Sequence, residues 1–474
     1  MVIGLEKWIS DGGGMVSSKI KVKKFLGKGH GVVAIEDIKP GERLILVRNA
    51  QLINMRNVYP YFLNFFSGDS TQLSDGISIL NTISAQGIMA LFLLMEQTSK
   101  SKSPWANFLS VLPTPEDLQT TPLTWERCET QEPSNSSQAN FKARKNNSNG
   151  GSNSDGDSNS DSDSEVEATI LHDAQWRLLS YSTRQYVLKQ EKNVTGDFKG
   201  CESLIKLLNS LAPTTTDLSM ITSAQYKHAW LCVNSRCLYH TLSAASSLKT
   251  RAFNWKASDN LTMAPYVDFL NHSTDTKLHC VAKTVTLGFE VCASPVSGYK
   301  KGEEILLCYG AHSNEKLLCE YGFCVDDNPW ETVDITNEIV SGYIMNKSET
   351  DFSKEINVLL NKYDYYDGYT INNHGLSFRT EVAIMAYLLY SKRNAIATRD
   401  PERSLNAFMN GLATLSDLKV HMKQILREIL VNVEQEIKDL ISNNSLRDSN
   451  VVKRLAVGKL TVVRNVLIQL NEDQ

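Results

Sequence analysis

Three short segments, far apart in the chain, contain residues whose types and spacing could bind a ligand and do chemistry on it. The first is a glycine-rich stretch, residues 27–31, in which Lys28, Gly29 and His30 precede an expected strand. Glycines let the backbone approach a ligand and expose its N–H and C=O groups to it. A simple hairpin turn explains the pattern equally well. A dinucleotide site is not indicated, because a strand pattern follows rather than a helix pattern.

The second segment, residues 268–273, places polar side chains after an apolar run. Asp268, Asn271 and His272 lie at the end of residues 262–270, which we expect to form a strand. An amide and an imidazole at a strand end offer several hydrogen-bond donors and acceptors in a small space. A buried polar turn with satisfied hydrogen bonds would have the same sequence, so this segment alone leaves both interpretations open.

The third segment combines acidic and aromatic residues. Residues 302–310 run from Gly302-Glu303-Glu304 through an apolar strand, expected at residues 305–309, to the pair Tyr309-Gly310. A second tyrosine follows in the sequence Tyr321-Gly322-Phe323. A tyrosine hydroxyl can orient a reacting group, but core packing of an aromatic ring would explain either Tyr-Gly pair by itself.

In this order, the three segments resemble the SET-domain methyltransferases. The signatures of that family are a G-x-G turn, an N-H-S element and a Gly-Glu strand that ends in tyrosine. The combination is similar to the subgroup typified by the Rubisco large-subunit lysine methyltransferase, which includes fungal enzymes that methylate ribosomal proteins and cytochrome c. Trp8-Ile9, residues 103–113, residues 233–236 and a helical last third support the likeness, which covers most of the chain except residues 129–168.

The resemblance implies S-adenosylmethionine as cofactor and a lysine of another protein as methyl acceptor. Tyr309 matches the family's catalytic tyrosine and would also contact the cofactor. The carbonyls of Arg236 and Asp268 would orient the substrate amine. The other residues implied at the cofactor are Lys28, Gly29 and His30 at its methionine end, Asn271 and His272 through backbone and side-chain contacts, Phe323 against adenine, and Tyr321 at the methyl-transfer pore.

The chain departs from the family pattern at three points. Lys28 stands where the family often has glutamate, which changes the charge at that edge of the cofactor. Additional Ser, Ala and Lys residues lie between Arg236 and Asp268. The zinc-binding cysteine cluster that follows many histone-directed SET domains is missing, so we expect no metal, and the C-terminal helices would have to form that wall of the lysine channel.

Composition is that of an ordinary globular protein. The 474 residues are 42% hydrophobic and 22% charged, and the net charge of −4 indicates no strong field for nucleic acid or membranes. The nine cysteines show no framework spacing, which favours a reduced, intracellular protein. We expect no signal peptide, no membrane span, no direct nucleic-acid binding and a monomer, located in the cytoplasm with the nucleus as a second compartment. Lysines within residues 19–28 form either a solvated strand face or a patch for an acidic partner.

The expected fold class is α+β, in three parts. Residues 1–18 form a helical segment. Residues 19–325 form a SET domain of short β-sheets with a knot-like C-terminal segment and a helical insertion at about residues 80–240. Within that insertion, the Asn/Ser/Asp-rich residues 129–168 are expected to be a disordered loop, because they contain too few apolar residues to offset the entropy of ordering.

Residues 331–474 are expected to be an all-α domain, because apolar residues recur there at helical spacing. This domain is either a docking surface for the substrate or pure structural support. By subgroup analogy, the substrate is expected to be a ribosomal protein or another translation component. Four alternatives stay open: transfer to a histidine, transfer to a histone, a catalytically silent SET protein that only binds a partner, and a chromatin scaffold recruited by the acidic insertion.

Overall fold

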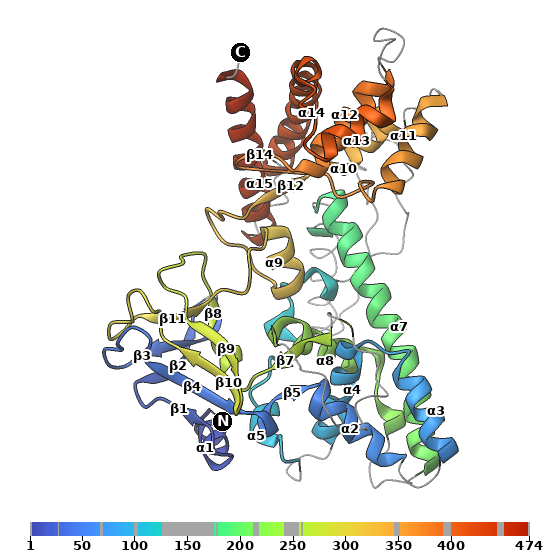
Figure 1. Cartoon of the computed structure of the whole chain (residues 1–474). Coiled ribbons are helices and arrows are strands. Elements are labelled where there is room, and N and C mark those ends of the chain that lie inside the picture. The colour runs from blue at the N-terminus through green and yellow to red at the C-terminus, as the bar shows by residue number, and fades with distance from the viewer. Residues whose placement is uncertain are drawn as a thin grey trace, which may run out of the picture.

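The protein is described here from a computed structural model of the whole chain (Figure 1). The expected disordered loop at residues 129–168 lies outside the described residues. The ranges that the structure describes are 2–26, 28–66, 70–98, 103–125, 175–176, 179–211, 218–240, 256, 259–345, 351–391, 400–442 and 450–472.

After helix α1 (Val2–Asp11), short strands within the first 310 residues form three small sheets. The strand orders are β1-β4-β10-β9, β2-β3-β11-β8 and β5-β7-β6, and the pairing is antiparallel except between β8 and β11, which are parallel. The bounds are β1 Met15–Val16, β2 Ile20–Phe25, β3 Gly29–Ala34, β4 Arg43–Arg48, β5 Ile53–Asn54, β6 Cys237–Tyr239, β7 Leu261–Met263, β8 Asn271–His272, β9 Val281–Val285, β10 Gly288–Cys292 and β11 Glu304–Leu307.

Two strand predictions differ from the structure in a way that matters for the site. Strand β3 begins at Gly29, so His30 lies in the strand and not in the turn before it. The single strand expected at residues 262–270 is wrong. Only Leu261–Met263 is extended, and Tyr266 then turns the chain with a φ of 72° into a 3₁₀ turn at Val267–Phe269. A sharp turn in an apolar run has no signature in hydrophobic periodicity, because both conformations bury their side chains.

The inserted region is helical, as expected, but its helices begin before residue 80. Asn54 caps α2 by accepting a hydrogen bond from the backbone N–H of Arg56, and α2 continues through Pro60, a residue that ordinarily argues against a helix interior. The helices are α2 Met55–Phe65, α3 Ser70–Leu80, α4 Ala85–Thr98, α5 Ala106–Leu109, α7 Tyr181–Leu211 and α8 Ser223–Arg236. Helix α9, Asn314–Tyr321, follows the last strand of the sheets.

Helix α4 explains the most apolar stretch of the sequence, because it is buried on nearly every side. Within the ranges given above, no helix by itself is long and apolar enough to cross a membrane. Helices α3 and α4 together reach the required length and composition, but they meet at a bend of 115°.

The C-terminal region is mostly helical, which confirms the expectation, but it is not all-α. Its helices are α10 Thr336–Ile339, α11 Asp351–Lys362, α12 Phe378–Ser391, α13 Pro401–Met409, α14 Ser416–Ser442 and α15 Asn450–Glu472. The correction is a three-stranded antiparallel sheet made of β12 Thr332–Asp334, β13 Thr370–Asn372 and β14 Gly375–Leu376. Strands of two or three residues are too short to show alternation, so they could not be recognised from the sequence.

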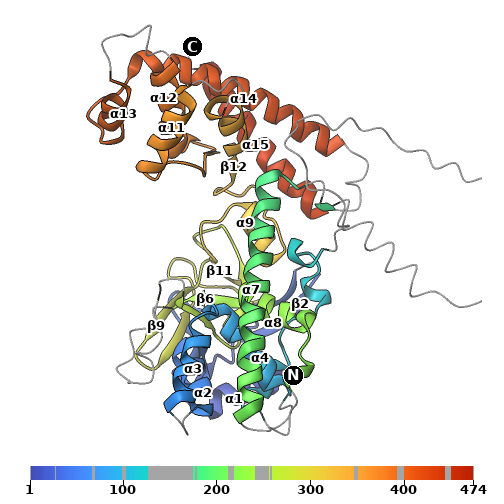
Figure 2. The same ribbon diagram turned by 90° about the vertical axis from the view of Figure 1, so that its right-hand side faces the viewer.

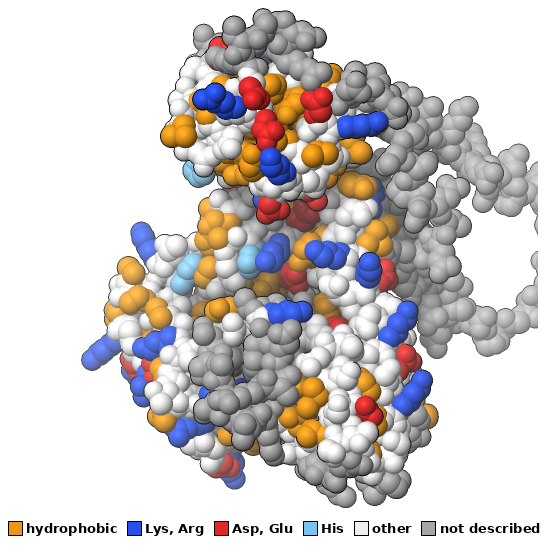
Figure 3. Space-filling view, turned by 45° about the vertical axis from the view of Figure 1, so that its right-hand side comes forward, with side chains coloured by type: hydrophobic (Ala, Val, Ile, Leu, Met, Phe, Trp, Pro, Cys, Tyr) orange, Lys and Arg blue, Asp and Glu red, His pale blue; other side chains and the backbone are white. Residues whose placement is uncertain are grey.

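Apolar side chains gather in one large core below residue 320 and in another above residue 332. A smaller cluster lies between them, where Leu318 and Cys324 pack against Val452 and Leu455 of α15. Beside this cluster, the almost fully buried Lys459 pairs with Glu315 at 3.1 Å. Helices α9 and α7 reach this junction from the larger body (Figure 2), and the molecule narrows there, with acidic and basic side chains at the narrow part (Figure 3).

Candidate active site

Pairing of three strands brings the three sequence segments together. The parallel pair β8–β11 sets Asn271 opposite Leu306 and His272 opposite Leu307. On its other side β11 pairs with β3, the strand that begins at Gly29. Figure 1 shows β3, β11 and β8 side by side. Ile305 and Leu307 supply the buried face of β11.

Asn271 is held by a carboxylate that sequence analysis did not assign to the site. Its side-chain amide donates a 2.7 Å hydrogen bond to Glu304, and the other oxygen of Glu304 lies 3.5 Å from the ammonium of Lys28. The amide oxygen of Asn271 is thereby turned away from the pair. Glu304 therefore offsets the positive charge at the position where the family often has glutamate. The sequence did contain a pattern that could have indicated Glu304, since this residue belongs to the Gly302-Glu303-Glu304 motif.

Gly31 allows this arrangement. A Cβ atom at Gly31 would lie 2.6 Å from the amide nitrogen of Asn271 and 2.8 Å from the carboxylate of Glu304. Non-bonded atoms do not approach that closely, so any other residue would displace the pair. Gly29, two residues earlier, has a φ of 73°, a left-handed conformation that glycine adopts without strain. The glycine-rich segment is thus both a turn and a cradle for polar side chains.

His272 is fixed in one tautomer. Its Nδ1 accepts a 3.1 Å hydrogen bond from the backbone N–H of Tyr309, so the ring proton of the neutral imidazole is on Nε2. Burial lowers the pKa of His272 to about 4, helped by the neighbouring His279 and His312, and the ring is neutral at physiological pH. Nε2 is buried, and none of the described residues accepts its proton. An unsatisfied buried donor is costly, which points to a ligand here.

Tyr309 lies across from these residues, partly buried. Its hydroxyl donates a 2.9 Å hydrogen bond to the carbonyl of Leu270. Burial raises the pKa of Tyr309 to about 12, so the phenol keeps its proton at neutral pH and cannot act as a strong base. Its ring lies 4.9 Å from that of Tyr321, between centroids, and 6.3 Å from that of Phe323.

The aromatic group extends beyond the residues predicted from the sequence. Phe323 lies 6.0 Å from His272, and Trp330 lies 6.2 Å from the same imidazole. On the opposite side, His30 contacts the ring of Phe269 edge-on at 5.9 Å. Trp330 was missed because it belongs to no recognised motif and reaches the site only through the fold.

Arg236 and Asp268 come together, but through their side chains. One guanidinium nitrogen of Arg236 donates to both the carboxylate and the backbone carbonyl of Asp268, each at 3.0 Å. The Asp268 side chain is fully buried, and burial raises the pKa of its carboxyl although Arg236 acts in the opposite direction. The predicted role of the two carbonyls stays a prediction, and the observed ion pair orders the turn that carries Leu270.

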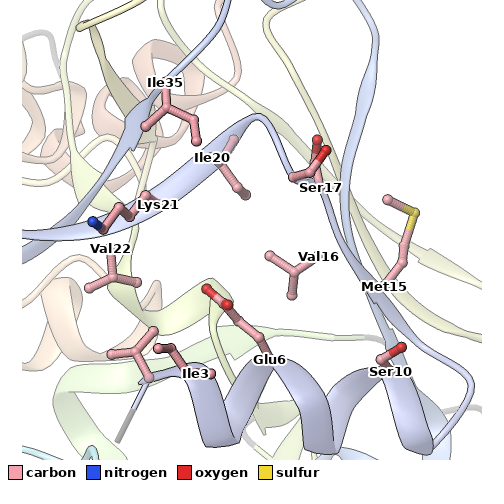
Figure 4. Close-up of a pocket in the computed structure, with 12 residues that line it drawn as sticks. Ile3, Glu6, Ser10, Met15, Val16, Ser17, Ile20, Lys21, Val22 and Ile35 are labelled. Atoms are coloured by element: carbon pink, nitrogen blue, oxygen red, sulfur yellow. The ribbon is translucent and has the colours of Figure 1, made fainter.

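Direct contacts therefore bring together Lys28 and Asn271 through Glu304, and His272, Tyr309, Tyr321 and Phe323 through their rings, whereas Gly29, His30, Arg236 and Asp268 join them through neighbouring residues of the chain. A separate cavity of about 400 Å³ lies between α1 and strands β1 and β2, with the carboxylate of Glu6 directed into it (Figure 4). None of the predicted site residues lines it. Glu6 accepts a 3.2 Å hydrogen bond from the hydroxyl of Tyr266.

The order β3-β11-β8, the hydrogen bond from Tyr309 to the Leu270 carbonyl and the polar group around Asn271 can be compared with known families. The sequence profile described as "SET domain" matches residues 29–310, more than half of the chain, and the protein belongs to the SET-domain family. A second profile, described as "Ribosomal lysine N-methyltransferase 2 C-terminal domain", matches residues 331–469.

Curated relatives narrow the comparison. The chain is 31% identical to ribosomal lysine N-methyltransferase 2 of Saccharomyces cerevisiae, over 52% of this chain and 49% of the relative. It is 28% identical to ribosomal lysine N-methyltransferase set11 of Schizosaccharomyces pombe, over 55% and 59%. It is 27% identical to human SET domain-containing protein 4, over 46% and 47%. The matches thus span about half the length of each relative.

Solved structures agree on the fold. The SET domain of LSMT bound to lysine and AdoHcy has a TM-score of 0.57 at 16% identity, covering 100% of this chain and 91% of that one. Rubisco LSMT bound to AdoMet has a TM-score of 0.54 at 17% identity, covering 100% and 92%. At this identity the likeness concerns the fold, and it extends over both the sheets and the C-terminal helices.

Proposed function

We propose that this protein is an S-adenosylmethionine-dependent protein-lysine N-methyltransferase. The observation that carries the proposal is the placement of the Tyr309 hydroxyl. It donates a hydrogen bond to the Leu270 carbonyl, and its ring lies close to the rings of His272, Tyr321 and Phe323. Membership of the SET-domain family and the names of the two fungal relatives support it.

The residues present fit the proposed cofactor. The buried N–H of His272, the amide oxygen of Asn271 and the open backbone at Gly29 are hydrogen-bonding groups that a polar ligand could satisfy. Phe323 offers an aromatic face at the same edge. The bound cofactor would supply a methyl group on a positively charged sulfur. The carboxylate of Glu304, next to Lys28, keeps this edge from accumulating positive charge.

The chemistry requires a neutral lysine amine. A lysine with a pKa of about 10.4 is neutral in about one molecule in two thousand at pH 7, a cost of roughly 4–5 kcal/mol. A dry channel beside the positively charged sulfur of the cofactor would disfavour the ammonium form and recover part of this cost. Because Tyr309 keeps its proton, its role is to orient the amine and not to remove the proton. Alignment of the reacting groups can lower the barrier by several kcal/mol.

Tyr309→Phe tests this role. The ring and its contacts remain, but the hydroxyl that donates to the Leu270 carbonyl, and that would orient the amine, is lost. We expect turnover to fall by about a hundredfold or more, as when one preorganised hydrogen-bonding group is removed from an active site. The measurement is transfer of labelled methyl groups. Tyr239→Phe, which alters a largely exposed tyrosine on β6, is the control. Near-normal turnover by a folded Tyr309→Phe protein would refute the role.

As substrate, we propose a ribosomal protein. The support is the match of residues 331–469 to the C-terminal profile of a ribosomal lysine methyltransferase, together with the two fungal relatives. The test uses ribosomal proteins from a yeast strain that lacks ribosomal lysine N-methyltransferase 2. They are incubated with this protein and labelled cofactor, and the labelled band is identified by mass spectrometry. Label on a lysine supports the proposal, whereas label on a histidine, or only on added histones, contradicts it.

We further propose a monomer that acts in the cytoplasm and the nucleus. Sedimentation would check the oligomeric state, and fluorescence microscopy would check the location.

A further inference from the structure

A second pocket lies where α15 crosses the segment that follows α9. Its volume is about 500 Å³, and none of the predicted site residues lines it. Figure 1 shows α15 beside β12 and above α9, and these elements are in contact. The lining residues come from the α9–β12 segment, the β13–β14 turn and α15: Val325, Asp326, Asp327, Asn328, Pro329, Glu331, Asn373, Lys453, Arg454, Val457, Gly458, Thr461 and Val462.

Glu331 forms the floor of this pocket and lacks a partner for one oxygen. Only 2% of the residue is exposed. Its Oε1 accepts hydrogen bonds from the backbone N–H groups of Asn314 at 3.1 Å and Thr332 at 3.2 Å. Its Oε2 is buried, and no donor to it occurs in the part of the chain that the structure describes. Burial raises the pKa of Glu331, although Asn314 and the neighbouring Lys459 act in the opposite direction.

The nearest buried cation, Lys459, already has other partners. Lys459 pairs with Glu315 at 3.1 Å and donates to the hydroxyl of Ser180 at 3.0 Å. At the rim, Arg454 pairs with Asp326 at 3.2 Å. The remaining charges that line the pocket are those of Asp327 and Glu331 against Lys453, which leaves the pocket negative.

The absence of a side chain at Gly458 leaves space beside the buried Oε2 of Glu331. A Cβ atom on this glycine would lie 2.8 Å from Oε2 of Glu331. Gly458 lies within α15, where glycine costs about 1 kcal/mol relative to alanine. The apolar side chains of Val325, Pro329 and Val457 form walls above the buried carboxylate.

We propose that this pocket binds an arginine side chain of the protein substrate and so holds the substrate beside the active site. The inference rests on the proposed function. Methylene groups of arginine would lie along the apolar walls, while the guanidinium would donate to Oε2 of Glu331. Trp330, which precedes Glu331, faces His272 at 6.2 Å, so the pocket and the active site share one segment of chain.

The first test separates docking from chemistry. Glu331→Gln keeps the shape and the Oε1 acceptor but removes the charge. We expect KM for the ribosomal protein substrate to rise about ten- to a hundredfold, which is the usual effect of losing a charged hydrogen bond. The value of kcat and the affinity for S-adenosylhomocysteine should stay unchanged. Glu434→Gln makes the same charge change on α14, outside the pocket, and should behave as wild type. An unchanged KM for Glu331→Gln would overturn the inference.

The second test does not depend on catalysis. N-acetylarginine amide is the probe, and its binding is followed by saturation-transfer NMR. Signals from its side-chain methylenes should appear with the wild-type protein and Glu434→Gln, and disappear with Glu331→Gln. They should also disappear with Gly458→Ala, a second variant that blocks the approach to Oε2 without changing charge. Equal signals in all four proteins, or binding of inorganic phosphate in the pocket, would overturn the inference. If the arginine probe binds while no ribosomal protein is methylated, the proposed function fails and the pocket stands.

Discussion

Replacing Arg236 by methionine tests how much the site depends on one buried ion pair. The Arg236 side chain is 20% exposed and that of Asp268 is fully buried, with both hydrogen bonds at 3.0 Å. The variant leaves a buried carboxylate, one oxygen of which already lacks a partner among the described residues, without its cation. Removing one partner of a buried pair costs about 3–5 kcal/mol. At about 2–4 °C per kcal/mol, Tm should fall by roughly 10 °C.

The loss of stability caused by Arg236→Met should depend on pH. Burial places the folded pKa of Asp268 above its unfolded value, so between the two the folded state binds more protons. Stability from this group therefore falls as pH rises through that interval. Without Arg236 the folded pKa should rise further. The difference in Tm between Arg236→Met and wild type should accordingly be smaller at pH 5 than at pH 8.

Thermal unfolding followed by tryptophan fluorescence at the two pH values is the assay. The double variant Arg236→Met/Asp268→Asn should regain part of the lost stability, because a neutral amide needs no cation. Arg464→Met, which removes the exposed partner of Glu434, should change stability by less than about 1 kcal/mol. Equal losses for Arg236→Met and Arg464→Met, or no change with pH, would show that the buried pair does not order this turn.

Two further predictions concern the cradle and the histidine. Gly31→Ala should weaken binding of S-adenosylhomocysteine at least tenfold in calorimetry, because its Cβ would displace the amide of Asn271. The control Gly196→Ala, where nothing lies within 4 Å of the added Cβ, should bind normally. Equal affinities of the two variants would contradict the role of Asn271 in cofactor binding. His272, with its pKa lowered to about 4, should show no ring titration by NMR between pH 6 and 8 and should cost stability as pH falls from about 6.5 towards 4; a titration near pH 6.5 would contradict its burial.

Short motifs predicted the strand edges of the site, and the fold supplied the rest. Gly29, Asn271 and Tyr309 could be placed because each belongs to a local pattern whose residue types suit its task. Glu304 stood in such a pattern, but nothing local distinguishes it from Glu303. Only the pairing of β11 with β3 and β8 shows which of the two carboxylates faces Asn271.

Contacts between distant segments could not be predicted in the same way. Trp330 reaches His272 after the chain has passed through α9, and Arg236 meets Asp268 across the residues that blurred the family pattern. The helices before residue 80 were missed because their apolar positions are interrupted by Pro60 and by polar residues. The helical stripes of the C-terminal region were recognised because long helices repeat their pattern many times.

Helix α9 connects the pocket around Glu331 with the active site. Its first residue, Asn314, donates its backbone N–H to Glu331 at the docking pocket, and its last residue, Tyr321, contacts Tyr309 in the active site. Helix α15 packs against α9 and holds it through the buried pair of Lys459 and Glu315. The C-terminal helices were expected to replace the missing zinc cluster as a wall of the lysine channel. That role stays a prediction, and the structure adds that α9 links Glu331 of the pocket to Tyr309 of the active site.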